Sequence, residues 1–140
     1  MNNEKPFEEI THLSPVQLQQ KGREIYASLK KSMLEEGYDL EQAETRILDL
    51  VSFIVSIDHF SSKEEYFLYK AIFGGEQDYD AFLVFAHASI DEEKRNEILS
   101  FYQKLGHASR EFAFELALCF MSSDGNVEED EKELLLKIRG

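Results

Sequence analysis

Apolar residues recur along most of the chain at intervals of three and four, which is the spacing of one helix face rather than of a strand. The seven glycines stand mostly at the ends of such stretches, and the two prolines, Pro6 and Pro15, lie near the start. Long stretches that lack proline and end at glycine are typical of helices. The pattern therefore predicts a compact all-α bundle of about seven helices.

Most of the predicted helices begin after a polar residue that can cap them. Ser14 followed by Pro15 is such a start, because serine accepts a hydrogen bond from the first turn and proline fits its geometry. Residues 1–12 are polar and are expected to form a flexible N-terminal segment, so that a single domain spans residues 13–140. We expect helices over residues 15–36, 40–57, 63–73, 92–104, 108–122 and 128–140. A further helix ends near residue 87 and starts after either Asp78 or Asp80.

Two of the predicted helices, 40–57 and 108–122, are apolar on nearly all sides. A helix of this kind is normally buried, and the two are expected to pack against each other at the centre of the bundle. If they run in the same direction, the turns that follow them meet in a common region. If they are antiparallel, these turns lie at opposite ends, and the sequence does not decide between the two arrangements.

Each of these two helices leads into an acidic turn and a further helix, and the two copies are offset by 66 residues (124 − 58 = 66). Glu65 stands seven residues after Asp58, and Glu131 stands seven residues after Asp124. Repetition of a helix–turn–helix unit predicts an internal two-fold duplication. At the same offset Leu50, Ser56, Leu68 and Ile72 fall on Leu116, Ser122, Leu134 and Ile138.

The second turn resembles the signature of the tellurite-resistance TerB-like family, with the run Asp-Gly-Asn-Val at residues 124–127 and Glu131 after three further residues. The resemblance is strong over 117–138 and moderate over 50–72, and it is architectural for the rest. His59 stands where the first turn would have its glycine, which departs from the family pattern. The resemblance implies a small all-helical domain with two related halves, associated with stress responses that include tellurite resistance.

The resemblance also implies that acidic residues of both copies hold a divalent cation, with Asp58, Glu65, Asp124 and Glu131 as the ligands. Ca²⁺ and Mg²⁺ are the expected ions, because both are hard cations that prefer oxygen ligands. Four carboxylates gathered in one place repel one another, and a bound cation would remove that cost.

Helix capping explains the two glutamates without any metal. Glu65 lies three residues after Ser62, and Glu131 lies three residues after Glu128, which is the spacing of a capping box. Acidic residues in a first helical turn also suit the helix dipole. Glutamate is a poor N-cap compared with serine, so capping explains Glu131 less well than Glu65. Both interpretations stay open at this point.

The charge and composition argue against several functions. The chain has a net charge of −13 and a pI of about 4.7 without any basic run, so nucleic acids and anionic membranes are unsuited as partners. The longest apolar stretch, Ile47–Ile57, is about half the length that spans a bilayer, which predicts no membrane insertion. The N-terminus lacks the features of a signal peptide, and a cytoplasmic location is expected. The single cysteine, Cys119, excludes an intramolecular disulfide and is expected to be buried.

No nucleophile motif and no phosphate-binding glycine loop is present. The resemblance implies a non-enzymatic protein that acts through cation binding and a protein partner. The alternative is a helical protein–protein interaction module whose acidic turns are only structural. A hydrolase with a metal-activated water is a third and weaker alternative, since it would require a cleft. A partner helix would need an apolar groove, although interior packing is favoured for its candidate lining, Phe73, Tyr79, Phe82 and Phe85.

Overall fold

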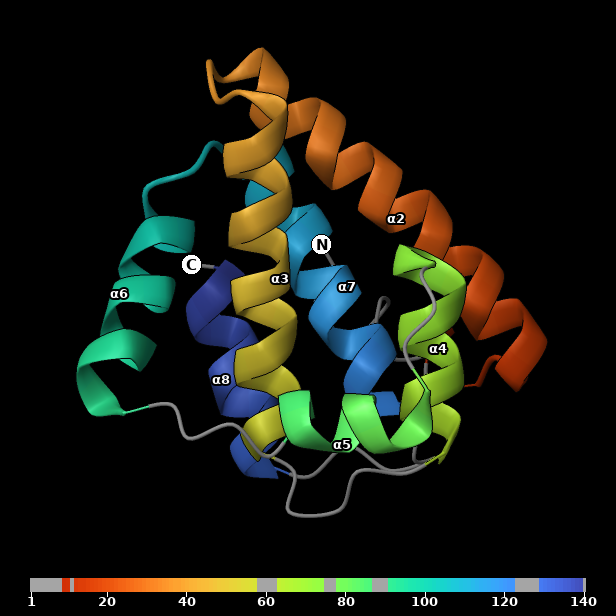
Figure 1. Cartoon of the computed structure of the whole chain (residues 1–140). Helices are drawn as coiled ribbons and strands as arrows, with labels where there is room; N and C mark the ends of the chain where they lie inside the picture. Colours follow the sequence, from red (N-terminus) through yellow and green to blue (C-terminus); the bar gives the residue numbers. More distant parts are fainter. Residues whose placement is uncertain are drawn as a thin grey trace.

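The computed structural model describes residues 9–10, 12–57, 63–74, 78–86, 91–122 and 129–139, and the side chains at 56, 57, 64, 85, 86 and 129–132 lie outside this description. The described residues form seven labelled helices and no strand, which confirms the prediction of an all-α fold for this part of the chain. The helices are α2 (Pro15–Glu35), α3 (Leu40–Ile57), α4 (Lys63–Phe73), α5 (Tyr79–Ala86), α6 (Glu92–Gln103), α7 (His107–Ser122) and α8 (Glu129–Arg139), as Figure 1 shows.

Local sequence sets most of the helix starts. Ser14 forms the expected cap of α2: its hydroxyl accepts a hydrogen bond from the Gln17 amide at 3.2 Å, and its own amide donates to Gln17 Oε1 at 3.0 Å. Asp39, Asp78 and Asp91 cap α3, α5 and α6 by accepting an amide hydrogen bond three residues further on, at 2.7, 2.8 and 2.8 Å. The predicted ends of α2 and α6 are each one residue too late.

The helices α3 and α7 pack against each other at the centre of the domain, as their apolar sequences predicted. Helix α2 packs along α7 and α4, and α8 packs along α7. Helix α6 covers the other side of α3, and α5 lies across one end of the bundle (Figure 1). We call this the α5 end.

The structure decides the direction that the sequence left open. Both α3 and α7 run toward the α5 end, and both α4 and α8 begin there (Figure 1). The described helix ends that flank residues 58–62 and 123–128 therefore gather at one end of the domain. The directions of α3 and α4 relative to the α5 end are thus the same as those of α7 and α8 (Figure 1).

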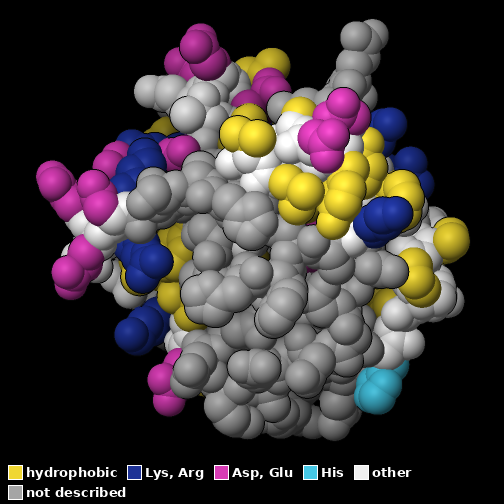
Figure 2. Space-filling view, turned by 60° about the horizontal axis from the view of Figure 1, so that its bottom comes forward, with side chains coloured by type: hydrophobic (Ala, Val, Ile, Leu, Met, Phe, Trp, Pro, Cys, Tyr) yellow, Lys and Arg dark blue, Asp and Glu magenta, His cyan; other side chains and the backbone are white. Residues whose placement is uncertain are grey.

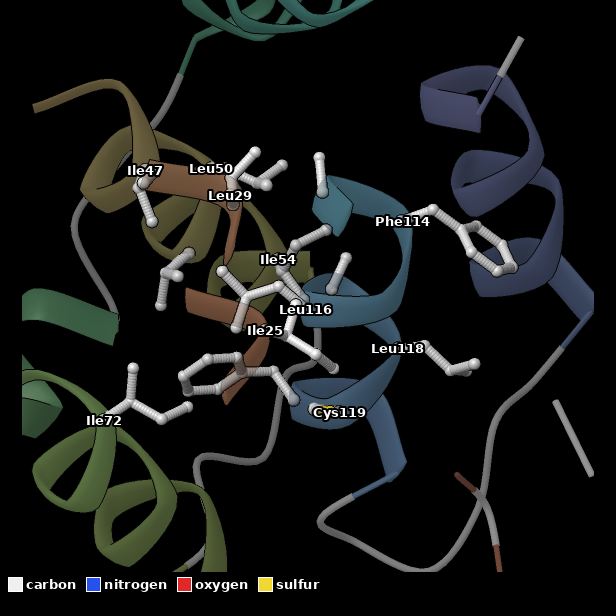
Figure 3. Packing of buried hydrophobic residues seen from close by; sticks show 14 of the residues in the cluster. Ile25, Leu29, Ile47, Leu50, Ile54, Ile72, Phe114, Leu116, Leu118 and Cys119 are labelled. Atoms are coloured by element: carbon white, nitrogen blue, oxygen red, sulfur yellow. The ribbon is translucent and has the colours of Figure 1, made fainter. Parts of the chain in front are cut away.

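The core is one continuous cluster, with α7 enclosed on nearly all sides. Ile10, which lies in the segment predicted to be flexible, is buried in this cluster, while residues 1–8 and 11 lie outside the described residues. Each fully buried aliphatic side chain contributes about 1.5–3 kcal/mol relative to an exposed one. Figure 3 shows the contributions of four helices, with Ile25 and Leu29 from α2, Ile47, Leu50 and Ile54 from α3, Ile72 from α4, and Leu116, Leu118 and Cys119 from α7.

The start of α7 is capped by the end of α2, which is distant in sequence. The Gly106 amide donates to Glu36 Oε1 at 2.8 Å, and the buried Ser109 hydroxyl donates to Glu36 Oε2. Ser32 and Ser109 share a further hydrogen bond of 2.6 Å between their hydroxyl oxygens. Glu36 thus accepts hydrogen bonds at the start of α7, where a helix has free donors. This cap was not predicted from the sequence.

Candidate functional site

The structure describes only one of the four predicted cation ligands at the level of its side chain. Asp58 and Asp124 lie outside the described residues, and Glu131 lies in α8 with its side chain outside the description. The described residues contain no group of three or more histidine, cysteine, aspartate or glutamate side chains that could hold a metal ion. The ligand set as a whole therefore stays a prediction.

Glu65, the one described ligand candidate, is buried. It lies in the first turn of α4 at the α5 end, and its exposed fraction is 1%. An ionised carboxylate is costly to bury unless it is paired or binds a cation, so glutamate is rarely found in such a position. This burial places the Glu65 side chain in the interior of the α5 end.

Ser122 is a second buried polar side chain at this end. It is the last residue of α7, its exposed fraction is 8%, and its hydroxyl has no hydrogen-bond partner among the described residues. A buried hydroxyl without a partner costs on the order of 1–3 kcal/mol. Ser122 directly precedes the second acidic turn in sequence, so its hydroxyl, which can accept or donate a hydrogen bond, is next to that turn along the chain.

A hollow between α3 and α6 was not predicted from the sequence. It has a volume of about 430 Å³, and we call it the α3–α6 hollow. No sequence motif marks these residues, because they come from two helices separated by about fifty positions and their spacing within each helix is ordinary. The lining consists of Tyr38, Asp39, Glu41, Gln42, Thr45, Arg46, Asp49, Lys94, Glu97 and Phe101.

Ion pairs join the two walls of the hollow. Arg46 Nη1 lies 3.2 Å from Glu97 Oε1. Lys94 Nζ lies 3.5 Å from Asp49 Oδ2 and 3.9 Å from Glu97 Oε2. The Arg46 guanidinium also stacks over the Phe101 ring, 4.5 Å from its centroid, which adds a cation–π contact to the ion pair.

The aromatic residues considered as a groove are largely interior. Phe82 is fully buried, and Phe73 and Tyr79 are half-buried against the core, while the Phe85 side chain lies outside the description. The Tyr66 ring contacts Tyr79 and Phe82 at centroid distances of 5.6 and 5.7 Å. Interior packing, the favoured alternative, is thus correct for Phe82.

Some apolar side chains of α4 and α5 remain exposed. Phe67 is 52% exposed and Val84 is 75% exposed. Figure 2, which turns the α5 end toward the viewer, shows hydrophobic side chains gathered beside the atoms drawn in grey, with basic side chains next to them. The ammonium groups of Lys63 and Lys70 lie 6.0 and 5.9 Å from the ring centroids of Tyr79 and Tyr66.

Cys119 is buried in the core as predicted. Its burial raises the pKa of the thiol to about 12, and the nearby Glu115 acts in the same direction. A thiol with this pKa is protonated at neutral pH and is a poor nucleophile or metal ligand. The structure thus gives Cys119 a packing role.

Comparison with known proteins adds no assignment: no family model, no curated protein and no solved structure matches the chain. The described helices include none that is both long and apolar enough to cross a bilayer. The resemblance to the TerB-like family therefore depends on the sequence pattern alone.

Proposed function

We propose that the chain is a non-enzymatic, cytoplasmic domain of the TerB-like kind that binds a divalent cation at the α5 end and acts through a protein partner in a stress response. The ligands are Asp58, Glu65, Asp124 and Glu131, and Ca²⁺ or Mg²⁺ is the ion. The observation that supports this proposal best is the common direction of α3 and α7. The helix ends that flank both acidic turns share one end of the domain (Figure 1).

The burial pattern supports the internal duplication on which this proposal depends. At the 66-residue offset, buried positions of α3 and α4 correspond to buried positions of α7 and α8. The correspondence is one of burial along the chain, because α8 packs along α7 whereas α4 packs mainly along α2. The matched buried pairs include Ile47 and Ala113, Leu50 and Leu116, Ile54 and Phe120, Tyr69 and Leu135, and Ile72 and Ile138.

The interior position of Glu65 places one of the proposed ligands inside the α5 end, next to the chain that leads out of the first acidic turn. Ser122, whose hydroxyl has no partner among the described residues, supplies a further oxygen at the same end.

The proposal is tested by thermal unfolding after chelation, with Ca²⁺, Mg²⁺, Mn²⁺ or Zn²⁺ added back to the wild type and to Asp58→Asn/Asp124→Asn. A ligand at a hundred times its dissociation constant stabilises a protein by about 2.7 kcal/mol, so the midpoint should rise by several degrees. The double variant should lose this rise.

The matched control is Glu24→Gln/Glu92→Gln, which removes two charges from exposed positions of α2 and α6. The control variant should keep the full cation response, because its two carboxylates lie outside the proposed site. Diffuse charge neutralisation would instead reduce the response of both variants equally. If no ion raises the midpoint while every variant stays folded, the cation-binding proposal is wrong and the carboxylates are caps.

A helical interaction module is the second candidate function, and the surface of α4 favours it. Lys63, Phe67 and Lys70 follow a spacing that places them on one side of the helix, and all three are exposed. An exposed phenylalanine between two lysines suits an acidic partner segment with an apolar residue. Retained partner binding after Asp58→Asn/Asp124→Asn, with no response to cations, would favour this candidate.

A further inference from the structure

The α3–α6 hollow has an excess of negative charge after its internal ion pairs are counted. Four of its lining residues are acidic and two are basic. The two basic residues, Arg46 and Lys94, are already engaged by Glu97 and Asp49. Glu41 and Asp39 have no cationic partner among the described residues. An incoming anion would therefore find no available positive group, whereas an incoming cation would find two available carboxylates.

Aromatic rings form the other part of the wall. Tyr38 and Phe101 contact each other edge to face, with ring centroids 5.4 Å apart. Arg46 already occupies a position over Phe101, which shows that a guanidinium group is accommodated against this wall between a ring and a carboxylate. Rings beside carboxylates favour organic cations, because the ring face and the carboxylate both attract positive charge.

The hollow is held in shape by hydrogen bonds in addition to its ion pairs, and Asp39, which has no cationic partner among the described residues, takes part in one of them as a helix cap. The buried Tyr102 hydroxyl donates to the Arg46 carbonyl at 2.8 Å and ties α6 to the backbone of α3. Asp39 and Gln42 form a reciprocal cap at the start of α3, with bonds of 2.7 and 3.0 Å. A site that is formed in advance loses less entropy when a ligand binds.

We infer that the α3–α6 hollow binds an organic cation, an ammonium or guanidinium group, between its unpaired carboxylates and its aromatic wall. Its volume of about 430 Å³ lies within the range of small-molecule sites and exceeds the needs of a bare metal ion. Its described side chains also contain no metal-binding group. The hollow lies along the first half of α3, away from the α5 end, so this inference is independent of the proposed divalent cation site.

Two probes distinguish the sources of such a cation. Spermidine represents a free polyamine, and a blocked glycine–serine peptide with one central arginine represents a basic side chain of a partner protein. Binding is followed by NMR amide shifts on the whole chain, and the same peptide with glutamine in place of arginine is the ligand control. We expect saturable shifts that centre on residues 38–49 and 94–101 for at least one of the two cations, and none for the glutamine peptide.

The variant that tests the site is Glu41→Gln, and its matched control is Glu44→Gln, which removes the same charge from the same helix at a position outside the lining of the hollow. The first variant should weaken binding about fivefold, since exposed charge contacts are individually modest, and the control should change it less than about twofold.

Either probe alone suffices to support the inference and identifies the source of the cation. Equal weakening by both variants would show long-range attraction to an acidic protein and would overturn the inference. Shifts centred outside the hollow, or no saturation at millimolar concentrations of either cation, would overturn it as well. Thermal unfolding of each variant confirms that a loss of binding is not a loss of fold.

Discussion

The helix pairs α3–α4 and α7–α8, which we call the first and the second unit, differ in how much of their first helix reaches solvent. Leu50 and Leu116 occupy corresponding positions, and both are fully buried. Leu48 is half-buried, whereas its counterpart Phe114 is fully buried. The second unit is therefore enclosed where the first is open.

The difference follows from the neighbours of each helix. Helix α7 packs against α2, α3, α6 and α8, so few of its positions are free to be polar. One side of helix α3 is covered by the short helix α6, and Arg46 and Asp49 on that side line the hollow. One unit provides the centre of the core, and the other provides a surface on which a small ligand can be held.

The largest expected effect is the loss of a central leucine. Leu116→Ala should lower the free energy of unfolding by about 3–5 kcal/mol, and Leu50→Ala by about 2–4 kcal/mol, because α7 is packed on more sides and its cavity can collapse less. Urea denaturation at constant m-value measures both. Leu136→Ala on α8, where the side chain is 47% exposed, is the control and should cost less than about 1 kcal/mol.

A smaller effect is expected where α2 meets α4, a contact of the first unit. A Cβ atom at Gly22 would lie 2.6 Å from Ile72 Cδ1 and 3.3 Å from Leu68 Cδ1, so Gly22→Val should destabilise the domain by about 1–3 kcal/mol through overpacking. Ala27→Val, at an exposed position of the same helix, controls for helix propensity and should cost about 0.5 kcal/mol. Equal midpoints of denaturation for the two variants would contradict this tight contact.

The smallest effect concerns the acidic residues that correspond in the two units, Asp49 and Glu115. Burial raises the pKa of Glu115, and Lys21 opposes this shift. The folded chain therefore keeps this proton to a higher pH than the unfolded chain, and its contribution to stability falls as pH rises above the ordinary value of 4.5. Glu115→Gln should stabilise the domain at neutral pH by less than about 1 kcal/mol.

The gain from Glu115→Gln should shrink toward zero as the pH falls below 4.5, which thermal unfolding at several pH values measures. Asp49→Asn should instead destabilise slightly at neutral pH, by no more than about 1 kcal/mol, because it removes the partner of Lys94. Opposite signs for the two variants would sharpen the contrast between the enclosed and the open unit. The same sign at neutral pH would remove it.

The helices of this protein could be predicted from local sequence. Helix spacing, caps such as Ser14 and Asp91, and the two apolar stretches were sufficient to predict the class of the fold, most helix ends and the central position of α3 and α7. These features are local, because a cap or an apolar face depends on residues three or four positions apart. The assignment of acidic residues of the two turns as cation ligands also came from the sequence, and it remains a prediction.

How these helices meet could not be predicted in the same way. The common direction of α3 and α7, the capping of α7 by Glu36, the burial of Glu65 and the α3–α6 hollow all depend on residues distant in sequence. Glu36 and Gly106, for example, are separated by 70 positions. Periodicity shows which side of a helix is buried but not which helix covers it, since many packings satisfy the same apolar pattern and long-range contacts select one of them.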